Sequence, residues 1–180
     1  MAENPIARFN RCLSDARQRG APLPEAVALA TADARGRPAV RYVLLKAADK
    51  HGFVFYTNLR SRKGRELARN PHASIAVYWD VTGHQVRIDG EVELVSGAEA
   101  DEYWGERPRE SRIASLVSNQ SAVLKSRAKL EAAYREATRR YGDGDIPRPN
   151  HWTGYRLIPS HIEFWIRREP RLHQRELYEK

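Results

Sequence analysis

Residues 26–58, AVALATADARGRPAVRYVLLKAADKHGFVFYTN, decide the fold class of this chain. Three apolar runs, at 26–31, 39–46 and 53–58, are separated by two turn-forming segments, Asp33–Pro38 and Asp49–Gly52. Apolar runs of this length joined by tight turns are typical of antiparallel strands, because parallel strands need crossovers of a dozen or more residues. We therefore expect an antiparallel β framework.

The rest of the chain predicts further strands and several helices. Strands are expected at 73–80, 84–94, 154–159, 161–167 and 171–178, and helices at 5–19, 61–69, from Ser96 to Glu106 and from Ser126 to Gly142. Alternation in the 84–94 strand places Val86, Ile88, Val92 and Leu94 on one buried face. The pattern predicts a mainly β chain of the α+β class, an antiparallel barrel with peripheral helices in a single domain over residues 1–180.

Composition limits the partners and the compartment. The 180 residues carry a net charge of +8, which favours an anionic partner: nucleic acid, a phosphorylated small molecule or a phosphorylated cofactor. A solvated excess of arginine explains that charge equally well. The lone Cys12 excludes an internal disulfide and favours a reducing, cytoplasmic location. No apolar run is long enough to span a bilayer, no secretory signal is visible, and the scattered histidines predict no metal site.

The segment Ser61-Arg-Lys-Gly64 is the most informative local feature. It opens the helix expected at 61–69, where the helix dipole already carries partial positive charge. Arg62 and Lys63 oppose that dipole, so an anion docked there would explain them, with the Ser61 hydroxyl as a further ligand. The alternative is a solvated basic turn, and this segment alone favours neither.

A second concentration of charge lies near the C-terminus. If 171–178 is a strand, Arg171, His173 and Arg175 share one of its faces. An anionic or electron-rich ligand lying across that face would account for them. A solvated edge strand protected by cations would account for them too.

Taken in order, these segments resemble the pyridoxine 5′-phosphate oxidase family. The matching stretches are Arg41-Tyr-Val-Leu-Leu-Lys46, Phe53–Asn58, Ser61–Gly64, Gln85–Gly90, Tyr103, Arg107-Pro-Arg109, Ser111, Gln120-Ser121, Ile162–Trp165 and Arg171-Leu-His173. They cover nearly the whole chain, with family-like spacing. The resemblance implies an FMN-binding split β-barrel of Greek-key type, with residues 152–180 as a C-terminal dimerisation region of a homodimer.

The resemblance also implies the roles of individual residues. The residues that would contact FMN are Arg41, Val43, Leu44, Tyr56, Thr57, Arg62, Lys63, Gln85, Gln120, Ser121, Trp165 and Arg175. Of these, Gln120, Ser121, Trp165 and Arg175 would come from the partner subunit. Substrate phosphate would be held by Lys46, Tyr103, Arg107 and Ser111, and Arg171 and His173 would frame the substrate ring as catalytic residues.

The implied reaction is oxidation of pyridoxine 5′-phosphate or pyridoxamine 5′-phosphate to pyridoxal 5′-phosphate, with O2 as acceptor and H2O2 released. Three departures from the family pattern concern the substrate: Ala114-Ser115-Leu116 in place of Gly-Ala-Trp, Gln174 in place of Asp, and Arg167 in place of Gly. An oxidase of another ring compound, such as a phenazine precursor, is therefore the alternative within the family. A non-catalytic carrier of FMN or pyridoxal phosphate is a second. Nucleic-acid binding has no recognition motif to support it.

Overall fold

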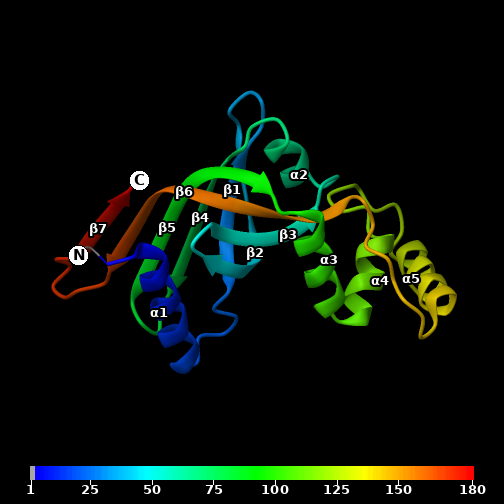
Figure 1. Cartoon of the computed structure of the whole chain (residues 1–180), viewed down its shortest axis with the longest axis horizontal. Coiled ribbons are helices and arrows are strands. Elements are labelled where there is room, and N and C mark those ends of the chain that lie inside the picture. Colours follow the sequence, from blue (N-terminus) through cyan, green and yellow to red (C-terminus); the bar gives the residue numbers. More distant parts are fainter. Residues whose placement is uncertain (1–2) are drawn as a thin grey trace. The chain divides into compact units, whose positions relative to one another are not determined.

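The computed structural model describes residues 3–180, which contain seven strands and five helices (Figure 1). In chain order these are α1 (Pro5–Gln18), β1 (Ala26–Ala32), β2 (Pro38–Asp49), β3 (Gly52–Asn58), α2 (Arg62–Leu67), β4 (His72–Trp79), β5 (His84–Leu94), α3 (Gly97–Glu106), α4 (Arg109–Val117), α5 (Arg127–Tyr141), β6 (Trp152–Ile166) and β7 (Gln174–Glu179). No helix within residues 3–180 is both long and apolar enough to cross a membrane.

The strands form one sheet in the order β3-β2-β1-β4-β5-β6-β7, and β3 also pairs with β6. This extra pairing closes six strands into a barrel, while β7 extends beyond β6 (Figure 1). The neighbours β1–β2, β1–β4, β2–β3, β4–β5 and β6–β7 are antiparallel. Placing β4 beside β1, after the β1-β2-β3 meander, is a Greek-key arrangement. The predicted antiparallel barrel of the α+β class is confirmed.

The chain divides into two compact units that are interleaved in sequence. The first holds the chain up to Tyr56 together with Glu66–Glu93 and Tyr155–Lys180, and the second holds Thr57–Arg65 and Leu94–Gly154. The single domain expected over residues 1–180 remains a prediction.

Alternation in the strands builds the core of the first unit. In β1, Val27, Leu29 and Thr31 are buried, and they meet Ile75 and Val77 of β4 and Val86 and Ile88 of β5. From α1, Phe9 packs edge-on against Phe53 at 5.1 Å between ring centroids and lies 5.7 Å from Trp79. Full burial of each such side chain contributes about 1.5–3 kcal/mol, so this cluster holds α1 to the barrel.

The second unit has its own aromatic core. Trp104 of α3 contacts Trp152 at 4.8 Å between ring centroids, and its indole N–H donates to the Ile146 carbonyl at 2.7 Å. Ser96 caps α3 by accepting from the Glu99 amide, as predicted. Ser126 and Gly142 bound α5, which also agrees with the sequence.

The structure differs from the sequence predictions in three places. The strands expected at 154–159 and 161–167 are one strand, β6, because Gly90 of β5 lets the β6 backbone pass very close: a Cβ on Gly90 would lie 2.0 Å from the Ile158 carbonyl oxygen. Helix α4 was not predicted, since Pro108 caps it without a side-chain hydrogen bond. Leu94, expected on the buried face of β5, is 54% exposed because it ends the strand.

Candidate functional site

A buried lysine marks the first cluster of predicted site residues, in the second unit. Lys63 is 8% exposed, and its ammonium donates to the Thr57 hydroxyl and to the Gln120 side-chain oxygen, both at 3.2 Å. Thr57 in turn donates to the same Gln120 oxygen at 3.3 Å. A buried ammonium is costly to desolvate unless several acceptors surround it, so this group can take an anion with several oxygens.

Tight backbone packing positions Lys63. Helix α2 is only six residues long, and the Ser61 hydroxyl accepts from the Gly64 amide at 3.2 Å. Ser61 therefore caps the helix as an acceptor, and the role of its hydroxyl as a donor to an anion stays a prediction. A Cβ on Gly64 would lie 2.4 Å from the Leu59 carbonyl oxygen, so only glycine allows this close approach. Arg62, by contrast, is exposed.

Arg41 lies in a second polar cluster, in the first unit, which the sequence did not reveal. Its guanidinium forms an ion pair with the buried Glu66 carboxylate at 3.1 Å and donates to the Thr31 hydroxyl, which donates to Glu66. Glu66 therefore orients Arg41 and partly offsets its charge. The only sequence signal was an acidic residue three positions after Lys63, and that spacing alone does not predict a contact with β2.

Tyr103 of α3, Arg107 in the link to α4, and Ser111 of α4 lie in the second unit, and Ser115 joins Arg107 to the backbone carbonyl of Ser111. The Arg107 guanidinium lies over the Trp152 ring at 4.6 Å and the Trp104 ring at 5.2 Å. Tyr103 stacks on the same Trp152 at 6.1 Å between centroids. Burial lowers the pKa of Arg107, the nearby Tyr103 raises it, and a second cation, Arg112, lowers it. A half-buried guanidinium in these surroundings favours an oxyanion ligand.

Trp165 and His173 form a third cluster, in the first unit. Their rings lie 4.5 Å apart, and His173 Nδ1 accepts from the Arg168 amide at 3.2 Å. On β7, Arg175 lies 3.8 Å from the Glu163 carboxylate of β6.

The prediction that Arg171, His173 and Arg175 share a strand face is wrong. Strand β7 begins only at Gln174, so Arg175 alone of the three lies on it. Arg171 instead has φ of 82°, and its amide donates to the Arg168 carbonyl at 2.9 Å, which makes a turn. The turn breaks the alternation of side chains on which the shared face depended.

The other predicted residues lie on barrel strands. Val43 and Leu44 of β2 pair with Val27 and Ala26 of β1, and Gln85 of β5 pairs with Tyr78 of β4. Lys46 is exposed and falls where the β2–β3 register shifts between Leu45 and Ala47, an irregularity that re-aims side chains. Tyr56, near the end of β3, is half-buried.

Gln120 and Ser121 occupy the loop after α4. Ser121 is exposed and has φ of 69°, and the side chain of Gln120 reaches Lys63 of its own chain. Gln120 therefore contacts Lys63 within one chain, and the expected contribution of Gln120 and Ser121 to the flavin of a partner subunit stays a prediction.

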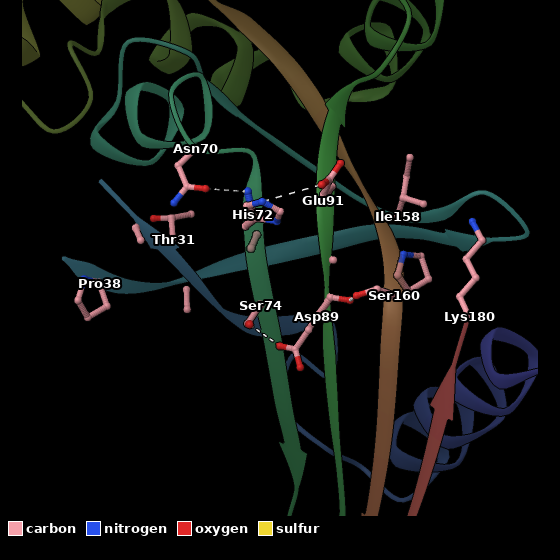
Figure 2. Close-up of a pocket in the computed structure, with 15 residues that line it drawn as sticks. Thr31, Pro38, Asn70, His72, Ser74, Asp89, Glu91, Ile158, Ser160 and Lys180 are labelled. Carbon is pink, nitrogen blue, oxygen red and sulfur yellow. Dashed lines mark hydrogen bonds and ion pairs between the residues drawn. The ribbon is translucent and has the colours of Figure 1, made fainter. Parts of the chain in front are cut away.

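A cavity of about 600 Å³ lies elsewhere, on β1, β4, β5 and β6 of the first unit (Figure 2). Figure 2 shows Ser74 bonded to Asp89, and His72 between Asn70 and Glu91, with the His72 ring 3.9 Å from the Glu91 carboxylate. None of the predicted site residues lines it. Its two carboxylates would repel a phosphate, so we do not assign the cofactor to it.

The fold and the cationic clusters define a class, the FMN-binding split barrels. A pyridoxamine 5′-phosphate oxidase-related FMN-binding protein from Nostoc punctiforme PCC 73102 has the same fold, with a TM-score of 0.73, 16% identity and 100% of both chains covered. At that identity the likeness concerns the fold alone.

The family follows from the sequence comparisons. The family model described as pyridoxamine 5′-phosphate oxidase matches residues 13–141, and the model of the pyridoxine 5′-phosphate oxidase C-terminal dimerisation region matches 152–180. The chain belongs to the pyridoxamine 5′-phosphate oxidase family, a family of flavoprotein oxidoreductases.

Similar proteins include relatives of two different names. The chain is 53% identical to the pyridoxine/pyridoxamine 5′-phosphate oxidase of Paraburkholderia phymatum, over 97% of this chain and 82% of the relative. It is 50% identical to the enzyme of the same name from Burkholderia mallei, over 97% and 81%. It also resembles PhzG from Burkholderia lata 383, solved in complex with tetrahydrophenazine-1-carboxylic acid, with a TM-score of 0.95, 36% identity and coverage of 99% and 88%.

The residues present fit a flavin mononucleotide. Its phosphate needs a compact group of donors, which the buried Lys63 ammonium and the Thr57 hydroxyl supply. The chain has no dinucleotide-binding glycine motif, which favours a mononucleotide.

Proposed function

We propose that the protein is an FMN-dependent oxidase that converts pyridoxine 5′-phosphate or pyridoxamine 5′-phosphate to pyridoxal 5′-phosphate in the cytoplasm. O2 is the electron acceptor and H2O2 is released. The observation that supports the proposal is the half-buried Arg107 guanidinium over the Trp152 and Trp104 rings, beside Tyr103; we propose that it forms, with Ser111, a second anion site separate from Lys63 and Thr57. Two anion sites match one phosphorylated cofactor and one phosphorylated substrate.

The protein's part in the reaction is binding and orientation. FMN, when bound, supplies the hydride acceptor and the route of the electrons to oxygen. Lys63, Thr57, Arg41 and Arg62 hold the FMN phosphate, with Glu66 keeping the Arg41 guanidinium in one orientation. The remaining predicted cofactor contacts are Val43, Leu44, Tyr56, Gln85, Gln120, Ser121, Trp165 and Arg175.

Substrate is held at two ends. Lys46, Tyr103, Arg107 and Ser111 bind its phosphate, and Arg171 and His173 lie at its ring. Because His173 Nδ1 accepts from the Arg168 amide, the neutral imidazole carries its proton on Nε2 and offers that N–H as a donor. Contact with the tilted Trp165 ring limits rotation of the imidazole, so the donor keeps a constant direction.

The test is steady-state oxidation followed by H2O2 release. We expect turnover of pyridoxine 5′-phosphate and pyridoxamine 5′-phosphate, and a KM for unphosphorylated pyridoxine at least 100-fold higher, since several charge-assisted bonds of about 1.5–3 kcal/mol each are lost. Arg107→Ala should chiefly raise KM, and Arg171→Ala should chiefly lower kcat. Equal use of pyridoxine and its 5′-phosphate would contradict the proposal.

The second candidate is an oxidase of a reduced phenazine carboxylate, favoured by the likeness to PhzG. The same assay with tetrahydrophenazine-1-carboxylic acid separates the two. Peroxide from this compound, and none from either phosphorylated vitamer, would transfer the assignment to the phenazine reaction. FMN bound without peroxide from any of these compounds would indicate a non-catalytic carrier.

We also propose a homodimer with composite sites, in which Trp165 and Arg175 serve the flavin held by the partner's Arg62. The match of residues 152–180 to a dimerisation region supports it. Mixing an Arg62→Ala protein with an Arg175→Ala protein should restore one intact FMN site per heterodimer. A monomer in sedimentation, or no recovery after subunit exchange, would contradict the arrangement.

A further inference from the structure

The Ser115 hydroxyl joins two residues of the anion site on α3 and α4. It donates to the Ser111 carbonyl at 2.9 Å, four residues earlier in α4, and it accepts from Arg107 Nη1 at 2.9 Å. The direction of both bonds is unambiguous, because a guanidinium only donates and a carbonyl only accepts. Donating its single proton to Ser111 therefore turns a lone pair of the Ser115 oxygen toward Arg107.

The Arg107 guanidinium is thus held by contact with two aromatic rings and by one hydrogen bond. The Trp152 and Trp104 rings contact it at 4.6 and 5.2 Å, and Ser115 takes one N–H of its edge. Contact with two rings confines the position of the guanidinium, whereas a hydrogen bond to one nitrogen limits its rotation. A guanidinium carries five N–H donors, so one bond to Ser115 leaves capacity for the two parallel bonds that an oxyanion accepts.

The positive charges of Arg107 and Arg112 favour an anion as the ligand. Arg112 of α4 adds a second positive charge, offset only by the exposed Asp145 carboxylate at 4.0 Å, and its Nε atom is buried without a hydrogen-bond partner among the described residues. Two guanidinium groups near each other repel, and a phosphate monoester between or beside them relieves the repulsion.

We propose that Ser115 is a positioning residue that sets the rotation of the Arg107 guanidinium for the phosphate of the substrate. It acts through Arg107 and does not touch the reacting atoms. The proposal rests on the proposed function, since it takes Arg107 to bind a phosphate monoester.

The test compares three variants of the full-length holoenzyme. Ser115→Ala removes the hydroxyl, Ser115→Thr keeps it, and Thr138→Ala is the matched control, because Thr138 in α5 makes the same hydroxyl-to-carbonyl bond, to Tyr134 at 2.9 Å, without an arginine partner. We expect Ser115→Ala to raise KM for pyridoxine 5′-phosphate about 5- to 20-fold with kcat within about twofold, as loss of one charge-assisted bond implies. The KM and kcat of Ser115→Thr and of Thr138→Ala should both stay near those of the unmodified protein.

A second readout uses inorganic phosphate, measured by calorimetry on the same proteins. Its dissociation constant should rise by the same factor in Ser115→Ala and not in Ser115→Thr. Equal KM values in Ser115→Ala and the unmodified protein, a fall confined to kcat, or failure of the unmodified protein to bind phosphate would each overturn the proposal. Absence of peroxide from any phosphorylated vitamer would instead remove the proposed function, and the phosphate measurement would still decide the role of Ser115.

Discussion

Replacing Gly64 by alanine tests the packing that positions Lys63. Two effects oppose each other. Alanine favours a helix over glycine by about 1 kcal/mol, and Gly64 lies inside α2. The added Cβ, however, would lie 2.4, 2.6 and 2.7 Å from the Leu59 carbonyl oxygen, carbonyl carbon and Cα. Carbon contacts normally lie at about 3.5–4.0 Å, so backbone must move by roughly 1 Å.

The clash should outweigh the helix preference. Overpacking against fixed backbone costs about 1–3 kcal/mol, and the three close contacts place this site at the upper end. The net loss is then about 2 kcal/mol, which corresponds to a fall in Tm of about 4–8 °C for a chain of this size. Since Lys63 precedes Gly64, the same shift should weaken FMN binding about tenfold through a poorer charge-assisted bond.

The assay is thermal unfolding at fixed protein concentration, together with FMN titration followed by flavin fluorescence. Gly105→Ala is the matched control, because Gly105 lies inside α3 and a Cβ there meets nothing within 4 Å. We expect that variant to be unchanged or up to about 1 kcal/mol more stable. A Gly64→Ala protein with the Tm and FMN affinity of the unmodified protein would refute the reasoning.

Three further predictions concern single charges. Lys63→Met should weaken FMN binding about 10- to 100-fold in fluorescence titration, and unchanged affinity would remove Lys63 from the phosphate site. The Arg8 guanidinium forms an ion pair with Glu176 of β7 and lowers the pKa of that carboxyl. Glu176→Gln should therefore speed hydrogen exchange of the β7 amides at pH 7, and the two proteins should exchange at the same rate at acidic pH. Equal exchange rates of the two proteins at both pH values would count against the pair. The Arg37 side chain lowers the pKa of Asp33 to about 2 from 3.8, so stability from this turn is present above pH 3.8 and lost toward pH 2. Unfolding midpoints of Asp33→Asn should therefore fall less between pH 5 and 2 than those of the unmodified protein, and parallel curves would contradict the shift.

Local pattern in the sequence determined much of the fold. The alternation at 26–31 and the tight turns predicted the β1-β2-β3 meander, since strand periodicity and turn chemistry are properties of neighbouring residues. The caps Ser96, Ser126 and Gly142 were readable for the same reason. Where a local signal was weak or misleading, prediction failed: α4 lacks a side-chain cap, and Arg171 adopts a left-handed turn that a run of strand-like residues concealed.

Part of the candidate site was likewise predictable from local sequence, and part was not. Lys63 could be chosen as a phosphate ligand from its place at the start of a helix, and Arg107 and His173 were named through the family resemblance. The side chains that form hydrogen bonds and ion pairs with the site cations could not be chosen from the sequence. Glu66 meets Arg41 across 25 positions, and Gln120 meets Lys63 across 57, contacts that exist only once the chain has folded.

Ser115 shows why the tertiary structure was needed. In the sequence it lies in a stretch where no helix was predicted, and its departure from the family pattern suggested only a change of substrate. In the folded chain its hydroxyl lies 2.9 Å from Arg107, whose guanidinium is held against Trp152, 45 positions further along the chain. Residue types and local order predicted phosphate binding, because charge and periodicity are properties of neighbouring residues. Which side chains orient those cations was decided only by packing, because a hydrogen bond depends on a direction and a distance that sequence spacing does not carry.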